Sequence, residues 1–320
     1  MTYKNGSMKI LVTPKEACEL LSSLPKELFL NADIAPTFGR VHDTNKLIDL
    51  LKDKAAVILD LEKIDAEVLS NCPNLKIISR FGEGCDAIDL EAAKKFEVRV
   101  ARTRGVASLA VARHAMSLVL SLTHNVVGNN KNLKEGQWAR RPNLSEESLT
   151  LGILGFGKIG AALADLASSF GFNVIIHSHS KPAESRYKFA ESIDELAGLS
   201  DILSINLPLT PQTKHLVSKE LIQKLKGKFI VNTSRGGLVD EEALFDSLES
   251  EGVTGYATDV FLAEPLSGIS RRLAEHPKVI CSPHIAAFDR NTAVNMTRRA
   301  LENALNCLQN KHDKVVSYVI

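Results

Sequence analysis

Three glycines that directly follow a short apolar run constrain the fold of this chain more than any other feature. Residues 151–160 read LGILGFGKIG, so Gly155, Gly157 and Gly160 stand in the spacing G-x-G-x-x-G between a strand pattern and a helix pattern. In that setting the first glycine permits a tight turn, the second lets the backbone approach a phosphate, and the third lets the helix pack against the strand. The spacing alone is weak evidence, but its position between a strand and a helix predicts a pyrophosphate-binding turn.

Composition narrows the class of partner. The 320 residues are 44% hydrophobic and 24% charged, which is typical of a globular protein and long enough for two domains. Lys and Arg number 39 against 38 Asp and Glu, so no overall basic field favours nucleic acid or an anionic membrane. We therefore expect a small-molecule partner.

The cysteines and the N-terminal segment predict a cytoplasmic protein. Five cysteines are scattered without a C-x-x-C pair, which indicates reduced thiols and no metal site. The first apolar run, residues 10–12, is too short for a signal peptide or a membrane anchor. We expect neither.

Apolar runs alternate with helix-period segments along nearly the whole chain, which predicts an α/β fold of doubly wound parallel sheets. In the first part, strands are expected at residues 8–12, 56–61, 75–79 and 98–101, with helices at 66–71 and 90–95. In the second part, strands are expected at 149–154, 173–177, 202–207, 229–232, 255–259 and 279–282. The second series is long enough for a complete Rossmann-like unit.

A helical stretch and a polar segment separate the two series. A long helix is expected at residues 109–127, followed by a polar arm at 128–147 that contains Trp138, the only tryptophan. The helical tail at 291–309 is expected to return to the first domain. These features predict a discontinuous outer domain of residues 1–102 and 287–320, and a second domain of residues 103–286.

Three reactive side chains come just after predicted strands of the second series: Arg235, Glu264 and His284. The carboxyl edge of an open α/β sheet is where ligands bind. There a guanidinium can bind a carboxylate, an imidazole can exchange a proton near neutral pH, and a carboxylate can hold the other imidazole nitrogen. Taken singly, each residue suits a surface salt bridge, a turn or a helix cap, whereas together they favour a catalytic site.

Several motifs in the same order give a family resemblance. They are SRFGEGCDAID at 79–89, the glycine turn, LPLTPQT at 207–213, and the segments 232–240, 259–266 and 282–285. With these motifs the chain resembles the D-isomer-specific 2-hydroxyacid dehydrogenases, which include phosphoglycerate dehydrogenase and the glyoxylate/hydroxypyruvate reductases. The resemblance implies two Rossmann-like domains, with a flavodoxin-like substrate domain, a dinucleotide domain, and a dimerisation arm around 109–147 that builds a homodimer.

The resemblance also implies a reaction. A hydride passes between a nicotinamide and C2 of a small D-2-hydroxy or 2-oxo acid of the glyoxylate, hydroxypyruvate or 3-phosphoglycerate class. His284 exchanges the proton of the substrate oxygen with Glu264 behind it, and Arg235 binds the carboxylate and polarises the carbonyl. Backbone N–H groups near Phe81 and Gly82 hold the carboxylate from the other domain. A different class, a dinucleotide-sensing corepressor-like binding protein, keeps the same three side chains and stays open.

The cofactor contacts implied by the resemblance cover the turn and the strand ends. Asp259 is expected to hold the carboxamide of the nicotinamide. The full set is Gly155, Gly157, Lys158, Ile159, Gly160, Ser178, His179, Lys181, Leu207, Pro208, Thr213, Thr233, Ser234 and Asp259.

The choice of nucleotide depends on Ser178. NAD-dependent family members carry an acid at this place for the ribose hydroxyls, and here no acid follows until Glu184. A serine flanked by His179 and Lys181 favours a 2′-phosphate. We therefore expect NADP rather than NAD, with tolerant NAD binding as the alternative.

Two further positions depart from the family pattern. Arg113 stands where glutamate is usual, and Ala286 and Ala287 replace small glycines after the histidine. Arg113 is expected to affect helix packing near the cofactor or to add a substrate contact. His114 is expected to be a core or interface histidine, and Trp138 either a dimer anchor or an ordinary core residue.

Overall fold

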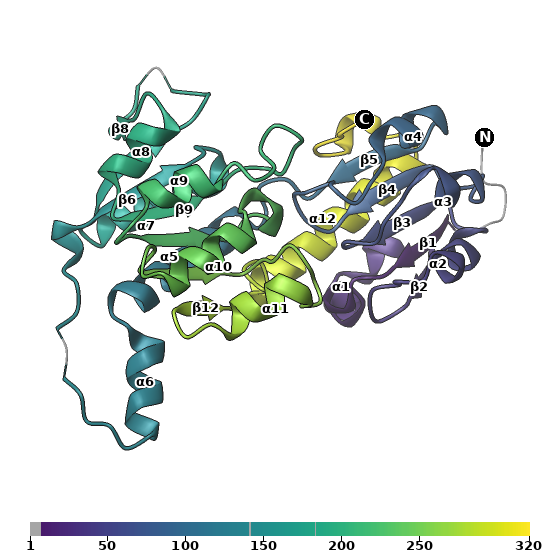
Figure 1. The fold of residues 1–320 in the computed structure, drawn as a ribbon. Coiled ribbons are helices and arrows are strands. Elements are labelled where there is room, and N and C mark those ends of the chain that lie inside the picture. Colours follow the sequence, from purple (N-terminus) through teal and green to yellow (C-terminus); the bar gives the residue numbers. More distant parts are fainter. Residues whose placement is uncertain (1–7, 141, 183) are drawn as a thin grey trace. The chain divides into compact units, whose positions relative to one another are not determined.

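The computed structural model describes residues 8–140, 142–182 and 184–320 (Figure 1). The chain divides into two compact units. The first unit contains the described residues up to Ala107 together with Phe288–Ile320, and the second unit is formed by the described residues from Ser108 to Ala287. Each unit is built on one parallel sheet, which confirms the predicted α/β class.

The first unit has a five-stranded parallel sheet in the order β2-β1-β3-β4-β5. Its strands are β1 (Met8–Val12), β2 (Ala32–Pro36), β3 (Ala56–Leu59), β4 (Ile77–Arg80) and β5 (Arg99–Arg102). Its helices are α1 (Lys15–Leu20), α2 (Thr44–Leu51), α3 (Ala66–Ser70), α4 (Leu90–Lys95) and α12 (Arg290–Leu308), with short 3-10 turns η1 (Leu21–Ser23), η2 (Lys26–Phe29) and η5 (His312–Lys314). The helix α12 packs on β3 and β4, and the buried Ser79 hydroxyl donates to the Ala300 carbonyl at 2.8 Å.

The second unit has a seven-stranded parallel sheet in the order β12-β11-β10-β9-β6-β7-β8. Its strands are β6 (Thr150–Leu154), β7 (Asn173–His177), β8 (Lys188–Phe189), β9 (Ile202–Ile205), β10 (Phe229–Asn232), β11 (Gly255–Thr258) and β12 (Val279–Cys281). Its helices are α5 (Ser108–Thr123), α6 (Val126–Lys134), α7 (Lys158–Ser169), α8 (Ile193–Leu199), α9 (Lys219–Lys224), α10 (Glu241–Glu249) and α11 (Gly268–Glu275), with η3 (Glu146–Ser148) and η4 (Gly236–Leu238). The order reverses beside β6, which creates the switch point where such sheets bind ligands.

The sheet of the second unit is buried on both faces. Adjacent residues of a strand pack into two different apolar clusters. Leu154 and Ile230 belong to one cluster, and their neighbours Ile153 and Val231 belong to the other. Side chains of a strand alternate between its faces, so a strand covered on both sides reads as a continuous apolar run. This is why the central strands were predictable.

Most helices begin at a residue that caps them. An aspartate or serine side chain accepts a backbone N–H of the first turn, which satisfies an amide that has no partner inside the helix. The capping residues are Asp43, Asp65, Asp89, Ser192, Ser218, Asp240 and Asp289.

The predicted helix at 109–127 is wrong in its extent. It is two helices, α5 and α6, separated at Asn125, whose φ of 46° is left-handed and interrupts the helical hydrogen bonding. The predicted polar arm therefore begins as a helix. No residue of α6 is buried, and Trp138 is 80% exposed, so the interpretation of Trp138 as a core residue is wrong. Residue 141 of the arm lies outside the described residues.

Candidate active site

The glycine turn connects β6 to α7 at the switch point of the second sheet. Gly155 has a φ of 101° and its amide donates to the His177 carbonyl at 2.8 Å. A Cβ on Gly155 would lie 2.4 Å from the Asn206 carbonyl oxygen, and one on Gly160 would lie 2.1 Å from the Gly155 carbonyl oxygen. Folding therefore requires these two glycines.

Gly157 has a different environment. No heavy atom lies within 4 Å of the Cβ that an alanine would place there. Gly157 caps α7, so the amides of Lys158, Ile159 and Gly160 open the helix without intrahelical partners. Open space beside Gly157, together with amides that have no intrahelical partner, fits a phosphate group, which needs close approach of the backbone.

Two polar atoms at the same sheet edge lack protein partners. The Asn206 side-chain oxygen follows β9, and the Thr233 hydroxyl follows β10; both are buried and unpaired within the described part of the chain. A buried unpaired polar atom costs about 1–3 kcal/mol, so such atoms usually meet a ligand or water. The edge therefore fits a polar cofactor, and the same strand ends carry the predicted residues.

Other predicted cofactor residues shape the neighbouring loops. The Ser234 hydroxyl donates to the Ile205 carbonyl at 2.9 Å. The Thr213 hydroxyl donates to the Pro208 carbonyl at 2.7 Å, which closes the loop that starts at Leu207. A Cβ on Gly155 would lie 2.8 Å from a methyl group of Leu207, so this side chain packs beside the glycine turn.

Ser178 directly follows β7, one residue after the carbonyl that binds the Gly155 amide. Its half-exposed hydroxyl accepts the Ser180 amide at 3.3 Å. His179 is exposed. The Lys181 ammonium lies 3.9 Å from a Glu191 oxygen, so it forms a salt bridge with an exposed carboxylate.

The residues near β10 and β11 bring two of the predicted catalytic side chains together. The Asn232 amide group donates to the Arg235 carbonyl at 2.9 Å, and its oxygen accepts the Ser234 amide at 3.0 Å. A Cβ on Gly236 would lie 2.0 Å from the Phe261 carbonyl carbon. The turn that carries Arg235 thus packs directly on the loop that carries Glu264.

Glu264 and His284 form a hydrogen-bonded pair. The Nδ1 of His284 lies 2.7 Å from Oε2 of Glu264, and Oε1 accepts the Phe261 amide at 2.9 Å. Burial alone would raise the pKa of Glu264, but the hydrogen bond and charge of His284, the Phe261 amide and the Arg235 guanidinium together lower it. Glu264 is therefore a carboxylate at neutral pH, which keeps the His284 proton on Nδ1.

The other imidazole nitrogen of His284 stays available. Nε2 has no hydrogen-bond partner among the described residues, and the side chain is 34% exposed. His284 has a φ of 55°, a left-handed conformation that non-glycine residues adopt rarely and often at functional sites. An exposed nitrogen on an otherwise fixed ring can exchange a proton with a ligand.

Asp259 has partners other than the predicted carboxamide. Its carboxylate is 1% exposed; Oδ1 accepts the Ser282 hydroxyl at 2.5 Å and the Ile285 amide at 2.9 Å, and Oδ2 accepts the Ala286 amide at 2.7 Å. These bonds hold the loop on both sides of His284. Sequence reasoning missed this role because it depends on which loop amides meet the carboxylate.

In the first unit the two predicted substrate-binding amides are already bonded. The Phe81 amide donates to the Leu59 carbonyl at 2.8 Å, and the Gly82 amide donates to the Thr103 hydroxyl at 2.9 Å. The sheet pattern continues past the end of β4 to Phe81, and a side-chain hydroxyl accepts the next amide, so neither amide is free for a ligand. The next two amides of the same loop, those of Glu83 and Gly84, have no partner in the described residues.

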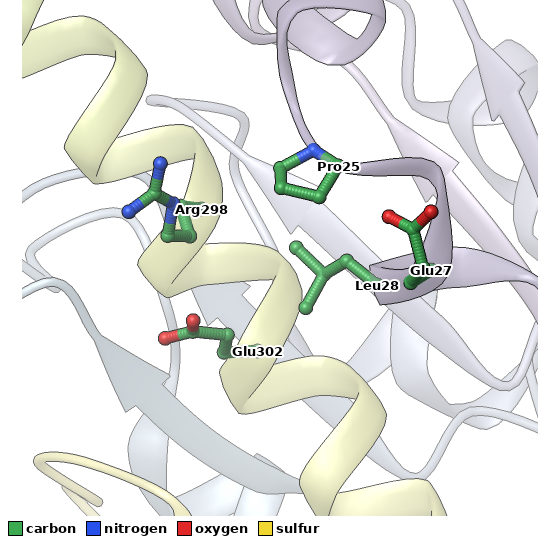
Figure 2. Close-up of a pocket in the computed structure, with 5 residues that line it drawn as sticks. All are labelled: Pro25, Glu27, Leu28, Arg298 and Glu302. Atoms are coloured by element: carbon green, nitrogen blue, oxygen red, sulfur yellow. The ribbon is translucent and has the colours of Figure 1, made fainter.

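A groove in the first unit is lined by residues outside the predicted site. It runs between η2 and α12 and is lined by Pro25, Glu27, Leu28, Arg298 and Glu302 (Figure 2). Within the described residues no group of three His, Cys, Asp or Glu side chains could hold a metal ion. In the same residues no helix is long and apolar enough to cross a bilayer.

Comparisons with known proteins decide the family. The NAD binding domain model of the D-isomer specific 2-hydroxyacid dehydrogenases matches residues 116–286. A hydroxypyruvate reductase of Thermotoga maritima is 38% identical over 266 residues, which cover 82% of this chain and 87% of that protein. The chain belongs to the D-isomer specific 2-hydroxyacid dehydrogenase family.

Further similarities agree with this family. A glyoxylate reductase of Thermofilum pendens is 35% identical over 277 residues, which cover 82% of this chain and 81% of that protein. A crystal structure of a Thermus thermophilus protein is 31% identical with a TM-score of 0.85 and covers 98% of this chain and 100% of that chain. This dehydrogenase is a nicotinamide-dependent oxidoreductase that transfers hydride at C2 of 2-hydroxy acids, as the resemblance predicted.

Proposed function

We propose that this dehydrogenase reduces a small 2-oxo acid, of the glyoxylate or hydroxypyruvate kind, with NADPH as the preferred reductant. The observation that carries the proposal is the His284–Glu264 pair at 2.7 Å, packed beside the turn that carries Arg235. The named activities of the Thermotoga and Thermofilum relatives support this substrate class. Oxidation of NADPH against a panel of 2-oxo acids tests it.

The chemistry divides between the cofactor and the side chains. A bound nicotinamide supplies the hydride that reaches C2 of the acid. In the reducing direction His284 carries a proton on both ring nitrogens and gives the one on Nε2 to the carbonyl oxygen, while the Glu264 carboxylate accepts from Nδ1 and keeps the ring oriented. Arg235 binds the substrate carboxylate through its forked guanidinium and polarises the carbonyl.

The first unit is the substrate-binding one in this proposal, and its donors are the amides of Glu83 and Gly84. This revises the expectation for Phe81 and Gly82, whose amides are used by Leu59 and Thr103. Backbone amides suit a carboxylate because they carry partial positive charge without side-chain mobility. The second unit, from Ser108 to Ala287, is the dinucleotide-binding one.

NADP is favoured over NAD by the position of Ser178. The residue stands beside the glycine turn and offers a hydroxyl where a carboxylate would repel a 2′-phosphate. His179 and Lys181 add exposed basic groups in the same loop, although Lys181 already lies near Glu191. Tolerant NAD binding is the alternative.

Substitutions at two glycines separate cofactor binding from folding. Gly157→Ala is expected to keep the fold and to raise the KM for NADPH about tenfold, because the new methyl group enters the space in front of the helix amides. Gly160→Ala is expected to destabilise the protein by about 1–3 kcal/mol or more, because its Cβ meets the Gly155 carbonyl at 2.1 Å. Thermal melts and NADPH titrations measure both. An unchanged KM for Gly157→Ala would argue against a phosphate at this turn.

We also propose that the segment 126–144 contributes to a homodimer. It exposes large apolar side chains at Val126, Val127, Leu133, Trp138 and Leu144. Figure 1 shows α6 standing away from the sheet of its own unit. Light scattering is expected to show a dimer, and the double variant Trp138→Ser with Leu133→Ser is expected to shift it toward monomer. A monomeric wild-type protein would contradict this arrangement.

We also propose a cytoplasmic location, which is supported by five cysteines that are free thiols.

A further inference from the structure

We propose that His114 is a positioning residue for His284, acting through the hydroxyl of Ser282 and the carboxylate of Asp259. The inference rests on the proposed function, in which His284 exchanges the proton of the substrate. His114 lies in α5, far in sequence from the loop that it affects, and both belong to the second unit. The sequence offered no sign of this role beyond a histidine in a mostly apolar helix.

The three groups form a continuous chain of contacts. The Nε2 of His114 lies 2.9 Å from the Ser282 hydroxyl oxygen, and that hydroxyl lies 2.5 Å from Oδ1 of Asp259. The distance from Nε2 of His114 to the same Oδ1 is 3.7 Å. The Asp259 side chain is 1% exposed and that of His114 is 22% exposed, so the contacts run from a partly buried histidine to a buried carboxylate.

Which atom donates in each of these hydrogen bonds follows from which of the three groups carries a proton. A carboxylate can only accept, so the single proton of the Ser282 hydroxyl points toward Asp259. The Ser282 oxygen is then free to accept, and the donor on its other side is an N–H on Nε2 of His114. His114 therefore fixes the rotation of the Ser282 hydroxyl and completes the shell around Asp259.

That shell brackets His284. Asp259 binds Ser282 two residues before His284 and binds the amides of Ile285 and Ala286 after it. The His284 amide also donates to the Asp259 carbonyl at 2.8 Å. Because His284 adopts a left-handed φ of 55°, the loop needs such bonds to hold it. A displacement of a reacting group by 1 Å can cost about 100-fold in rate.

The test replaces His114 with side chains that place an N–H group at different distances from the backbone of α5. In His114→Gln the new amide nitrogen lies where Nε2 lies now, in His114→Asn it reaches only as far as Nδ1, and in His114→Leu the side chain offers no donor. We expect the Asn and Leu variants to lower kcat about 10- to 100-fold, with the KM values for NADPH and the 2-oxo acid within about threefold. The Gln variant is expected to recover most of the loss.

Further readouts separate positioning from folding. The kinetic isotope effect on kcat with NADPH deuterated at C4 is expected to rise in the slow variants, since a misplaced acid slows the chemical step. Ser282→Ala is expected to show the same loss as His114→Leu, and the double variant no further loss, because the two groups act in series. Ser121→Ala serves as the control, because the Ser121 hydroxyl donates to the Ser117 carbonyl of its own helix.

The proposal is overturned by a wild-type kcat in His114→Leu, by equal losses in the Gln and Leu variants, or by losses that multiply in the double variant. If the Leu variant does not fold, the Gln and Asn pair and Ser282→Ala decide the question. His284→Gln is assayed in parallel: retained turnover there defeats the proposed function itself. An inactive His284→Gln with an unaffected His114→Leu defeats this inference alone.

Discussion

His284→Gln is expected to lower kcat about a thousandfold while the affinity for NADPH stays near the wild-type value. A positioned acid or base contributes about 10²–10⁴ to rate, and glutamine cannot transfer a proton near neutral pH. Nε2 is the nitrogen available for the substrate, because Nδ1 is held by Glu264 at 2.7 Å. Steady-state reduction of a 2-oxo acid measures kcat, and NADPH fluorescence titration shows that the variant still folds and binds.

A second histidine provides the control for this substitution. His312 lies in the first unit, where its Nδ1 is 3.0 Å from the Tyr318 hydroxyl, and His312→Gln is expected to leave kcat unchanged. Retained turnover in His284→Gln would remove His284 from the mechanism. Loss of NADPH binding in the same variant would instead show that the substitution disturbs the cofactor site.

Ser178→Asp is expected to reverse the preference between the two nucleotides. A carboxylate at the end of β7 repels a 2′-phosphate and accepts hydrogen bonds from the ribose hydroxyls of NADH. The ratio of kcat/KM for NADPH to that for NADH is expected to fall about 100-fold, which corresponds to about 2.7 kcal/mol. Initial rates at equal, low concentrations of each nucleotide measure this ratio.

Ser180→Asp adds the same charge two residues further along the loop and is the matched control. Ser180 is exposed, and its amide donates to the Ser178 hydroxyl at 3.3 Å. A specific contact at Ser178 predicts a much smaller shift for Ser180→Asp. An equal shift in both variants would show that the added negative charge, rather than a specific contact at Ser178, changes the preference. Equal use of NADH and NADPH by the wild-type protein would contradict the proposed NADP preference.

Most of the strands that sequence patterns predicted are largely buried, and β12, an edge strand without a buried residue, was predicted as well. The runs at β7 and β10 match their predicted bounds, because continuous apolar residues in a covered sheet leave little ambiguity. The strand β2 was not predicted, since Asp33 and Pro36 interrupt its pattern and no residue in it is fully buried. The strand β8 has only two residues, and its pairing to β7 depends on tertiary contacts.

Dependence on tertiary contacts also limits what the sequence predicts about the site. Residue type and place along the chain predicted one site with Arg235, Glu264 and His284, and the structure shows a contact between Glu264 and His284. Motif spacing predicted a substrate-binding loop at Phe81 and Gly82, but not that the amides of both residues form hydrogen bonds within the protein. The partners of Asp259 were equally unpredictable, since they depend on how the loop after β12 folds back.

The most direct test of the account follows NADPH absorbance while purified protein is mixed with glyoxylate or hydroxypyruvate. We expect oxidation of NADPH with formation of an equal amount of the 2-hydroxy acid, and loss of both in His284→Gln. NADPH that binds to the protein but is oxidised with none of the 2-oxo acids would contradict the account. That result is what a dinucleotide-sensing binding protein on the same fold would give.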